Sequence, residues 1–197
     1  MKNLYFIRHG ISEHNILFSK YGKSVFYDQR YYDTKLTDEG VEQSIVLGNT
    51  WKDINKIELV ICSSLSRTLE TARGIFTKTD IPILALDILK EYPQGLQTCN
   101  KRSEKKELIE KFPEIDFTNV DDNETMWNTE REESIDELNE RIKLLNEFIK
   151  TREETEIAIV SHNSFIGQYK DGEISLIENG KEELAHCYPY KIIFNKI

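Results

Sequence analysis

The chain has 197 residues, of which 39% are hydrophobic and 31% are charged. This length and apolar fraction predict one domain with a real core and exclude wholesale disorder. The 26 Lys and Arg against 35 Asp and Glu give a net charge of −9, which argues against nucleic acid or an anionic membrane as the main partner. An anion would have to bind in a local basic pocket, so clustered arginines become informative.

Cysteine usage and the N-terminus indicate the cellular setting. Cys62, Cys99 and Cys187 form an odd set without CxxC spacing, which disfavours both a disulfide framework and a zinc ribbon. The apolar run in MKNLYFIRHG is too short for a signal peptide, and nowhere do about 18 uncharged apolar residues occur together. The sequence therefore predicts a soluble, cytoplasmic protein.

Strand and helix signals alternate along the chain. Apolar runs predict strands at 4–7, 57–62, 81–89 and 156–160, a closing strand at 191–197 and a further candidate strand at 174–178. A helix is predicted over 37–52, with Thr37 as its N-cap and one face formed by Val41, Ile45, Gly48 and Trp51. Another helix follows the second strand and carries Leu69, Ala72, Ile75 and Phe76. The alternation predicts a three-layer α/β/α fold around a mainly parallel sheet.

Charged residues dominate the sequence between about 92 and 155. Ser134 and Glu137 form a capping-box pattern there. Apolar residues recur after it at helical spacing, at Ile135, Leu138, Ile142, Leu145 and Ile149. Because the sequence shows neither an internal repeat nor a Gly/Ser/Pro linker, we expect one domain over 1–197 with a small helical cap inserted at about 92–155.

Polar residues follow the predicted strands at their carboxyl ends, where parallel sheets collect ligands. The set comprises Arg8, His9, Ser63, Ser64, Arg67, Glu91, Ser161 and His162. Two neighbouring arginines make a fork-shaped receptor for a phosphate, and a neutral imidazole within it is a nucleophile toward phosphorus. A carboxylic acid at the mouth would protonate a leaving alcohol. This set predicts phosphoryl transfer through a phosphohistidine.

In their order, the motifs resemble those of the histidine phosphatase superfamily, which includes the cofactor-dependent phosphoglycerate mutases. The motifs are R-H-G with a later Asn (Arg8, His9, Gly10, Asn15), L-T-x-x-G (Leu36, Thr37, Gly40), S-x-L-x-R-T-x-x-T-A (Ser63 to Ala72), E-x-x-x-G (Glu91, Gly95) and S-H (Ser161, His162). The resemblance covers most of the chain. It implies that His9 carries the phosphoryl group and that Glu91 protonates the leaving oxygen. It also implies that the phosphoryl group is held by Arg8, Arg67 and His162 and touched by Asn15.

Two departures from the family pattern favour a phosphatase over a mutase. Tyr92 stands where the mutase branch has an Arg after its catalytic Glu, and the mutases are longer. We take Tyr92, Lys101 and Arg102 as candidate substrate-binding residues, since the loop from 92 to 101 and the cap would choose the substrate. The cations Lys101, Arg102 and Arg131 are candidates for binding a second anionic group, although salt bridges on a solvated face are the commoner role of such residues. The helix after His162 is expected to be stopped within two turns by Gly167 and the turn Lys170-Asp171-Gly172-Glu173.

Three functions stay open at this point. The first is a hydrolase of a small phosphorylated metabolite, the second a phosphoglycerate-type phosphomutase, and the third a non-catalytic phospho-ligand or protein-binding domain. No cofactor or metal is expected, because the sequence lacks HExxH and paired arginines would repel a cation. His14 is expected either at the site or in packing beside Asn15, and His186 is expected to be structural or exposed. The sequence does not predict an oligomeric state.

Overall fold

The computed structural model describes residues 1–174 and 184–195. One sheet lies at its centre, with five strands in the order β3-β2-β4-β1-β5. The strands are β1 (Lys2–Arg8), β2 (Leu59–Ser63), β3 (Ile83–Leu86), β4 (Glu156–Ser161) and β5 (Pro189–Phe194). Strands β1 to β4 run parallel and β5 pairs antiparallel with β1. The prediction of an α/β fold with a mainly parallel sheet is confirmed.

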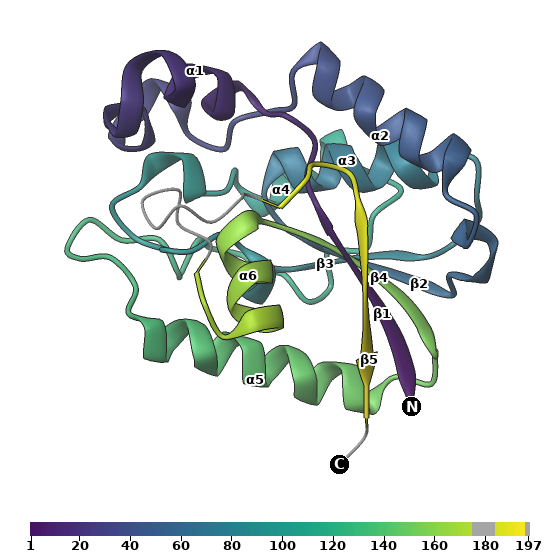
Figure 1. The fold of residues 1–197 in the computed structure, drawn as a ribbon. Helices are drawn as coiled ribbons and strands as arrows, with labels where there is room; N and C mark the ends of the chain where they lie inside the picture. The colour runs from purple at the N-terminus through teal and green to yellow at the C-terminus, as the bar shows by residue number, and fades with distance from the viewer. Residues whose placement is uncertain (175–183, 196–197) are drawn as a thin grey trace.

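Helices cover both faces of this sheet (Figure 1). The helices described are α1 (Glu13–Tyr21), α2 (Asp38–Thr50), α3 (Ser66–Phe76), α4 (Lys105–Lys111), α5 (Ile135–Thr151) and α6 (Asn163–Asp171). Of these, α2 and α3 cover one face of the sheet, and α5 and α6 cover the other. Successive residues of a strand point to opposite faces, so β1 contributes to two separate cores. Tyr5 and Ile7 pack with α2 and α3, whereas Leu4 and Phe6 pack with α5 and α6. None of the helices in the described part of the chain is long and apolar enough to cross a membrane.

The helix termini largely follow the sequence signals. Thr37 caps α2, since its Oγ1 accepts a 3.1 Å hydrogen bond from Gly40 N. Both hydrogen bonds of the Ser134–Glu137 capping box are present at the start of α5. Helix α6 has nine residues and ends at Gly172, whose φ of +66° suits a glycine. The candidate strand at 174–178 lies, beyond its first residue, outside the described residues.

The predicted buried face of α2 is wrong for two of its four positions. Val41 and Ile45 are 40% and 42% exposed, and the buried residues of the helix are Gly40, Ser44 and Leu47. Small residues let α2 approach its neighbours closely, because a Cβ on Gly48 would overlap the backbone carbonyl of Ile75 in α3. A hydrophobic pattern in the sequence indicates buried large apolar side chains, but it does not indicate close backbone contacts made by small residues.

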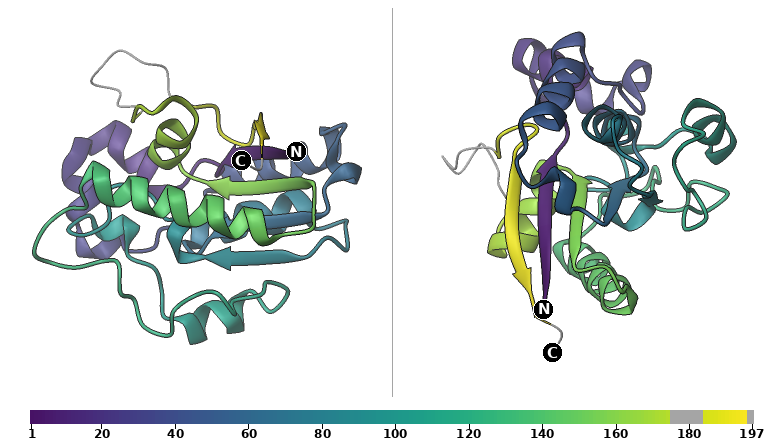
Figure 2. Two further views of the ribbon diagram at one scale, coloured as in Figure 1. Left: turned by 90° about the horizontal axis from the view of Figure 1, so that it is seen from below. Right: turned by 90° about the vertical axis from the view of Figure 1, so that its right-hand side faces the viewer.

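The predicted insertion divides into two parts. Helix α5 belongs to the layers of the fold, since Leu138, Leu145 and Ile149 are fully buried against the sheet. The segment 92–134 lies outside these layers, beyond β3 (Figure 2). It covers the edge of β3 by pairing, because Ala85 N donates to Asp116 O and Asp116 N donates to Ile83 O, each at 2.9 Å. A covered edge strand cannot pair with another chain.

Candidate active site

His9 lies where β1 ends and is placed by the sheet itself. Its backbone N donates a 3.1 Å hydrogen bond to Ser161 O of β4. The ring Nδ1 lies 2.7 Å from Gly10 O, and because a carbonyl only accepts, Nδ1 carries the hydrogen and Nε2 keeps a lone pair. Burial, and then the charge of Arg67, holds the pKa of His9 well below its usual value. His9 is therefore a neutral imidazole with a nucleophilic Nε2.

The three other histidines of the chain all surround His9. Their ring centroids lie 5.2 Å (His162), 5.6 Å (His186) and 6.0 Å (His14) from that of His9. Burial, followed by the charge of Arg67, also lowers the pKa values of His14 and His162 well below the usual range. Within the described ranges, no group of three or more His, Cys, Asp or Glu side chains is arranged to hold a metal ion.

Arg67 and His162 each carry a buried nitrogen that has no hydrogen-bond partner among the described residues. Arg67 is fully buried in the first turn of α3, and its Nε has no hydrogen-bond partner among the described residues. His162 Nε2 lies 2.9 Å from Ser63 Oγ, while its buried Nδ1 likewise has no partner within residues 1–174 and 184–195. An unsatisfied buried polar group costs about 1–3 kcal/mol, so two such nitrogens in the cluster around His9 fit a site that binds a polar ligand.

Arg8 is 3% exposed and precedes His9 at the end of β1. Its Nη1 donates a 2.8 Å hydrogen bond to Leu184 O, in the segment that leads into β5. The two arginines thus reach the cluster from different elements, Arg8 from β1 and Arg67 from α3.

Glu91 lies between the end of β3 and the start of α6. Its Oε1 accepts hydrogen bonds from Tyr92 N at 2.8 Å and Phe165 N at 3.3 Å, and its Oε2 accepts one from Ser164 N at 3.4 Å. Burial raises the pKa of Glu91 above its usual value, although these N–H groups and the arginines act against the rise. A carboxyl group with a raised pKa is suited to hold a proton and donate it.

Asn15 and His14 lie next to each other on one side of the histidine cluster. Asn15 Oδ1 accepts from Ser12 N at 3.0 Å and Ser12 Oγ at 2.6 Å, which caps α1. Asn15 Nδ2 lies 3.4 Å from His14 Nε2, and His14 Nδ1 lies 2.7 Å from Thr34 Oγ1. The Asn15 carbonyl oxygen is used by the cap of α1, so its amide nitrogen is the group that faces His14.

The expected substrate cations Lys101 and Arg131 are engaged by the protein. Lys101 Nζ lies 4.5 Å from the centroid of the Trp127 ring, and Arg131 Nη2 lies 2.6 Å from Glu137 Oε1. Tyr92, the third candidate in this region, is partly buried, and burial raises the pKa of its phenol.

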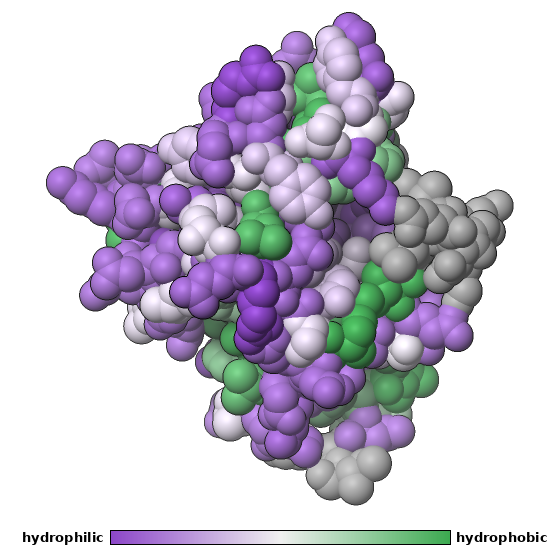
Figure 3. Space-filling view, turned by 90° about the vertical axis from the view of Figure 1, so that its left-hand side faces the viewer, coloured by the Kyte–Doolittle hydropathy of each residue, from purple (hydrophilic) through white to green (hydrophobic). Residues whose placement is uncertain are grey.

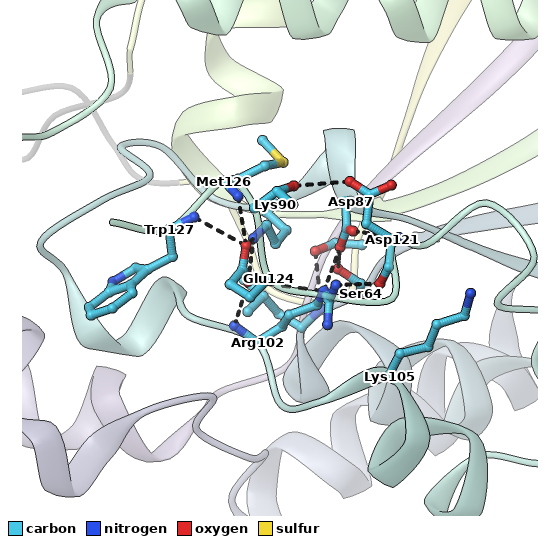
Figure 4. A network of polar contacts seen from close by, with 12 residues as sticks. Ser64, Asp87, Lys90, Arg102, Lys105, Asp121, Glu124, Met126 and Trp127 are labelled. Carbon is cyan, nitrogen blue, oxygen red and sulfur yellow. Dashed lines mark hydrogen bonds and ion pairs between the residues drawn. The ribbon is translucent and has the colours of Figure 1, made fainter. Parts of the chain in front are cut away.

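The structure contradicts the prediction that Arg102 binds substrate. Its side chain is fully buried in the network of Figure 4, where Nε donates to Asp87 at 3.0 Å and Nη2 donates to the carbonyls of Asp121 at 2.6 Å and Asn123 at 2.8 Å. In the same network Lys90 Nζ lies 2.6 Å from Glu124. The sequence reveals a cation in a polar segment but does not reveal the buried carboxylates that hold it.

His186 was expected to be structural or exposed, and the position of its ring centroid, 5.6 Å from that of His9, was not predicted. It follows no predicted strand, and only the pairing of β5 with β1 brings it to His9. The motifs that resemble the histidine phosphatase superfamily end at His162, so no sequence motif indicated that His186 lies beside His9.

Gly10 and Gly40, one from each of two motifs, pack against each other. A Cβ on Gly10 would lie 2.5 Å from Gly40 O, closer than real Cβ atoms come. A Cβ on Gly40 would overlap the carbonyl of Ile11. The two glycines allow α2 to lie directly against the loop that carries His9.

The side of the molecule where α1 and segment 92–134 meet is shown as a surface in Figure 3. It is largely hydrophilic and is hollowed near its centre. Such a surface suits a polar ligand better than an apolar one.

Comparison with known proteins agrees with this geometry. The family model of the histidine phosphatase superfamily (branch 1) matches residues 4–169, and the chain belongs to this family. A phosphoglycerate mutase-like protein of Arabidopsis thaliana is 30% identical, with 84% of this chain and 72% of that protein covered. A probable phosphatase of Schizosaccharomyces pombe is also 30% identical, with 82% and 74% covered. The crystal structure of the alpha-ribazole phosphatase from Shigella flexneri shares the fold, with a TM-score of 0.62, 21% identity, and 98% of this chain and 91% of that chain covered.

Proposed function

We propose that this protein is a phosphomonoester hydrolase that acts through a phosphohistidine at His9. His9 Nε2 attacks the phosphorus of a small phosphate monoester, the bond from phosphorus to the ester oxygen breaks, and Glu91 gives its proton to that oxygen. Water then attacks the phosphorus of the phosphohistidine and gives a proton to Glu91, while the bond from phosphorus to His9 Nε2 breaks. Inorganic phosphate is released, and His9 and Glu91 return to their starting states. The observation that carries the proposal is a neutral imidazole, His9, in a cluster with two buried nitrogens, Arg67 Nε and His162 Nδ1, that have no hydrogen-bond partner among the described residues. In the proposed complex both nitrogens donate to the phosphoryl group.

The same donors would supply the electrostatic part of catalysis. Charge that builds on the phosphoryl oxygens in the transition state is stabilised by preorganised donors in a water-poor site. Arg8, Arg67 and His162 fill this role in the proposal, and Asn15 Nδ2 adds a further contact. Because the arginines provide the positive charge, the proposed reaction requires no metal ion.

Hydrolysis is favoured over a mutase reaction by the cations of segment 92–134. A phosphoglycerate carries a carboxylate besides its phosphate, and its recognition needs a second cationic group. Arg102 is fully used inside the protein, and Arg131 and Lys101 are engaged with Glu137 and Trp127. These contacts support a substrate with one phosphate group.

The cytoplasmic setting expected from the sequence stays a prediction.

The test is a screen of phosphorylated metabolites and p-nitrophenyl phosphate for release of inorganic phosphate, with the His9→Ala protein as the blank. We expect release by the wild-type protein and none above background by the variant. Conversion of 3- to 2-phosphoglycerate after priming with a bisphosphoglycerate, without phosphate release, would instead establish the mutase. Tight phosphate binding without turnover of any ester would establish the binding domain.

A further inference from the structure

His186 reaches His9 through the register of the antiparallel strand pair. Pro189 of β5 lies opposite Ile7 of β1, and His186 forms a bridge with Arg8. Cys187 N donates a 2.9 Å hydrogen bond to Arg8 O. The last strand of the sheet therefore delivers an imidazole to the end of the first strand, where the nucleophile lies.

The contact between the two histidines has a defined direction. His186 Nδ1 lies 2.5 Å from the backbone oxygen of His9, and the two rings are inclined by 58°. Since a carbonyl oxygen only accepts, His186 Nδ1 carries the hydrogen and donates it. His9 in turn donates from its own Nδ1 to Gly10 O at 2.7 Å. Two successive carbonyls at the nucleophile are thus each held by an imidazole N–H.

The segment around His186 is fixed on both sides of the histidine. Cys187 has a φ of +48°, in the left-handed region that residues with a Cβ seldom adopt. Before His186, Leu184 N donates to Asn163 Oδ1 at 3.0 Å, and Leu184 O accepts from Arg8 at 2.8 Å. An uncommon backbone conformation persists only where the surroundings determine it, and here it lies next to a residue that touches the nucleophile.

We propose that His186 is a positioning residue for the reaction, holding the main chain of His9 by the hydrogen bond from its Nδ1 so that His9 Nε2 stays in line with the phosphorus. This inference rests on the proposed hydrolysis at His9. A displacement of about 1 Å between reacting atoms can cost about 10²-fold in rate, so one hydrogen bond to the nucleophile's own peptide can affect turnover. The bond acts on the nucleophile and leaves the anion donors of Arg67 and His162 in place.

Substituting His186 with Asn or with Gln distinguishes a positioning role from a role in packing alone. The Nδ2 of an asparagine takes the place of histidine Nδ1, whereas the Nε2 of a glutamine takes the place of histidine Nε2. With p-nitrophenyl phosphate, we expect His186→Asn to keep kcat within about threefold of the wild type and His186→Gln to lower it by about 10- to 100-fold. Inhibition by inorganic phosphate should change by less than about threefold in both variants, since the arginines are untouched.

A matched control lies two residues further along the same segment. Tyr188 is 55% exposed and packs on Tyr190, so Tyr188→Leu disturbs the segment without touching His9, and we expect wild-type kcat. Rescue by Gln with failure of Asn would overturn the proposal, as would equal activity of both variants or loss of activity in Tyr188→Leu. Thermal unfolding identifies a variant that fails to fold; if the Gln variant is lost in this way, a low kcat of folded His186→Asn still overturns the proposal.

A second measurement is independent of turnover. Long-range ¹H–¹⁵N NMR correlations report which ring nitrogen of His186 carries the hydrogen, and we expect Nδ1. An unprotonated Nδ1 would overturn the proposal even in an active enzyme. A wild-type protein that hydrolyses no ester, with Nδ1 protonated, would instead contradict the proposed hydrolysis and leave the contact itself established.

Discussion

The Nη1 atom of Arg67 donates a 2.8 Å hydrogen bond to the backbone carbonyl of Cys99. Its Nη2 atom donates to Asn100 Oδ1 at 3.1 Å, so both bonds join α3 to segment 92–134. The segment thus fixes the plane of the guanidinium, while Nε stays buried and without a partner in the described part of the chain. In the proposed reaction, an arginine held in this way is preorganised to bind a phosphoryl oxygen.

This arrangement predicts the effect of replacing Arg67. We expect Arg67→Ala to lower kcat/KM by at least about 10²-fold, the usual cost of removing one donor from a preorganised anion site. Arg67→Lys should recover only part of the loss, because an ammonium group cannot reproduce the geometry of the guanidinium. Steady-state hydrolysis of p-nitrophenyl phosphate measures both effects. Near-normal rates in both variants would mean that the phosphoryl group binds elsewhere.

The role of Glu91 is tested by changing the leaving group. An alkyl phosphate expels a basic alkoxide that needs a proton, whereas nitrophenyl phosphate expels a stable phenolate. We expect Glu91→Gln to lose about 10²- to 10⁴-fold on an alkyl phosphate and much less on nitrophenyl phosphate. Equal losses on both esters would make Glu91 a residue that positions the substrate and would remove its role as proton donor.

The pH dependence follows from the same two groups. Burial lowers the pKa of His9, so His9 stays neutral and nucleophilic into the mildly acidic range. Burial raises the pKa of Glu91, so its proton is lost only above the usual carboxyl pKa. We therefore expect kcat/KM on alkyl phosphates to be highest at mildly acidic pH, with the decline at higher pH flattened in Glu91→Gln. A basic limb that is identical in the variant would assign that titration to another group.

The packing of Gly10 on Gly40 predicts a structural effect on the site. Alanine is a better helix former than glycine, yet in Gly40→Ala the Cβ would overlap the carbonyl of Ile11, next to the loop of His9. We expect a loss of about 1–3 kcal/mol in the free energy of unfolding and lower activity. Val41→Ala, at a 40% exposed neighbouring position, is the control and should be nearly neutral. Unfolding in urea measures both; a stabilised Gly40→Ala protein would contradict the packing.

The network of Figure 4 predicts that Arg102 contributes to stability. Arg102→Met leaves the buried Asp87 carboxylate without its cation, which costs about 3–5 kcal/mol. Lys101→Met, one residue earlier, removes only a contact with the Trp127 ring and should cost less than about 1 kcal/mol. Equilibrium unfolding compares the two variants, and a similar small loss in both would show that Arg102 is not held by the network.

The sequence predicted those elements of the fold that carry a continuous hydrophobic pattern or a local capping motif. The four parallel strands were found because buried parallel strands are continuous apolar runs, and the caps at Thr37 and Ser134 are local hydrogen-bond patterns. The face of α2 was wrong because its closest contacts are made by glycine and serine, which carry no hydrophobic signal.

The candidate site was predictable where its residues follow strand ends. His9, Arg67, Glu91 and His162 gather because parallel strands end at one edge of the sheet. The burial of Arg102 and the proximity of His186 to His9 were not predicted, because the surroundings of both residues are made by distant parts of the chain. The partner of Arg102 comes from the end of β3, and His186 depends on the register of β5 against β1.

Trapping the covalent intermediate on His9 tests the central claim most directly. The wild-type protein is mixed with a ³²P-labelled phosphate ester, quenched within milliseconds and digested, and the labelled peptide is identified. We predict label on the peptide that contains His9, stable in alkali and lost in acid as a phosphoramidate is, and no label in His9→Ala. An acid-stable phosphoprotein, or label that persists in His9→Ala, would contradict the account.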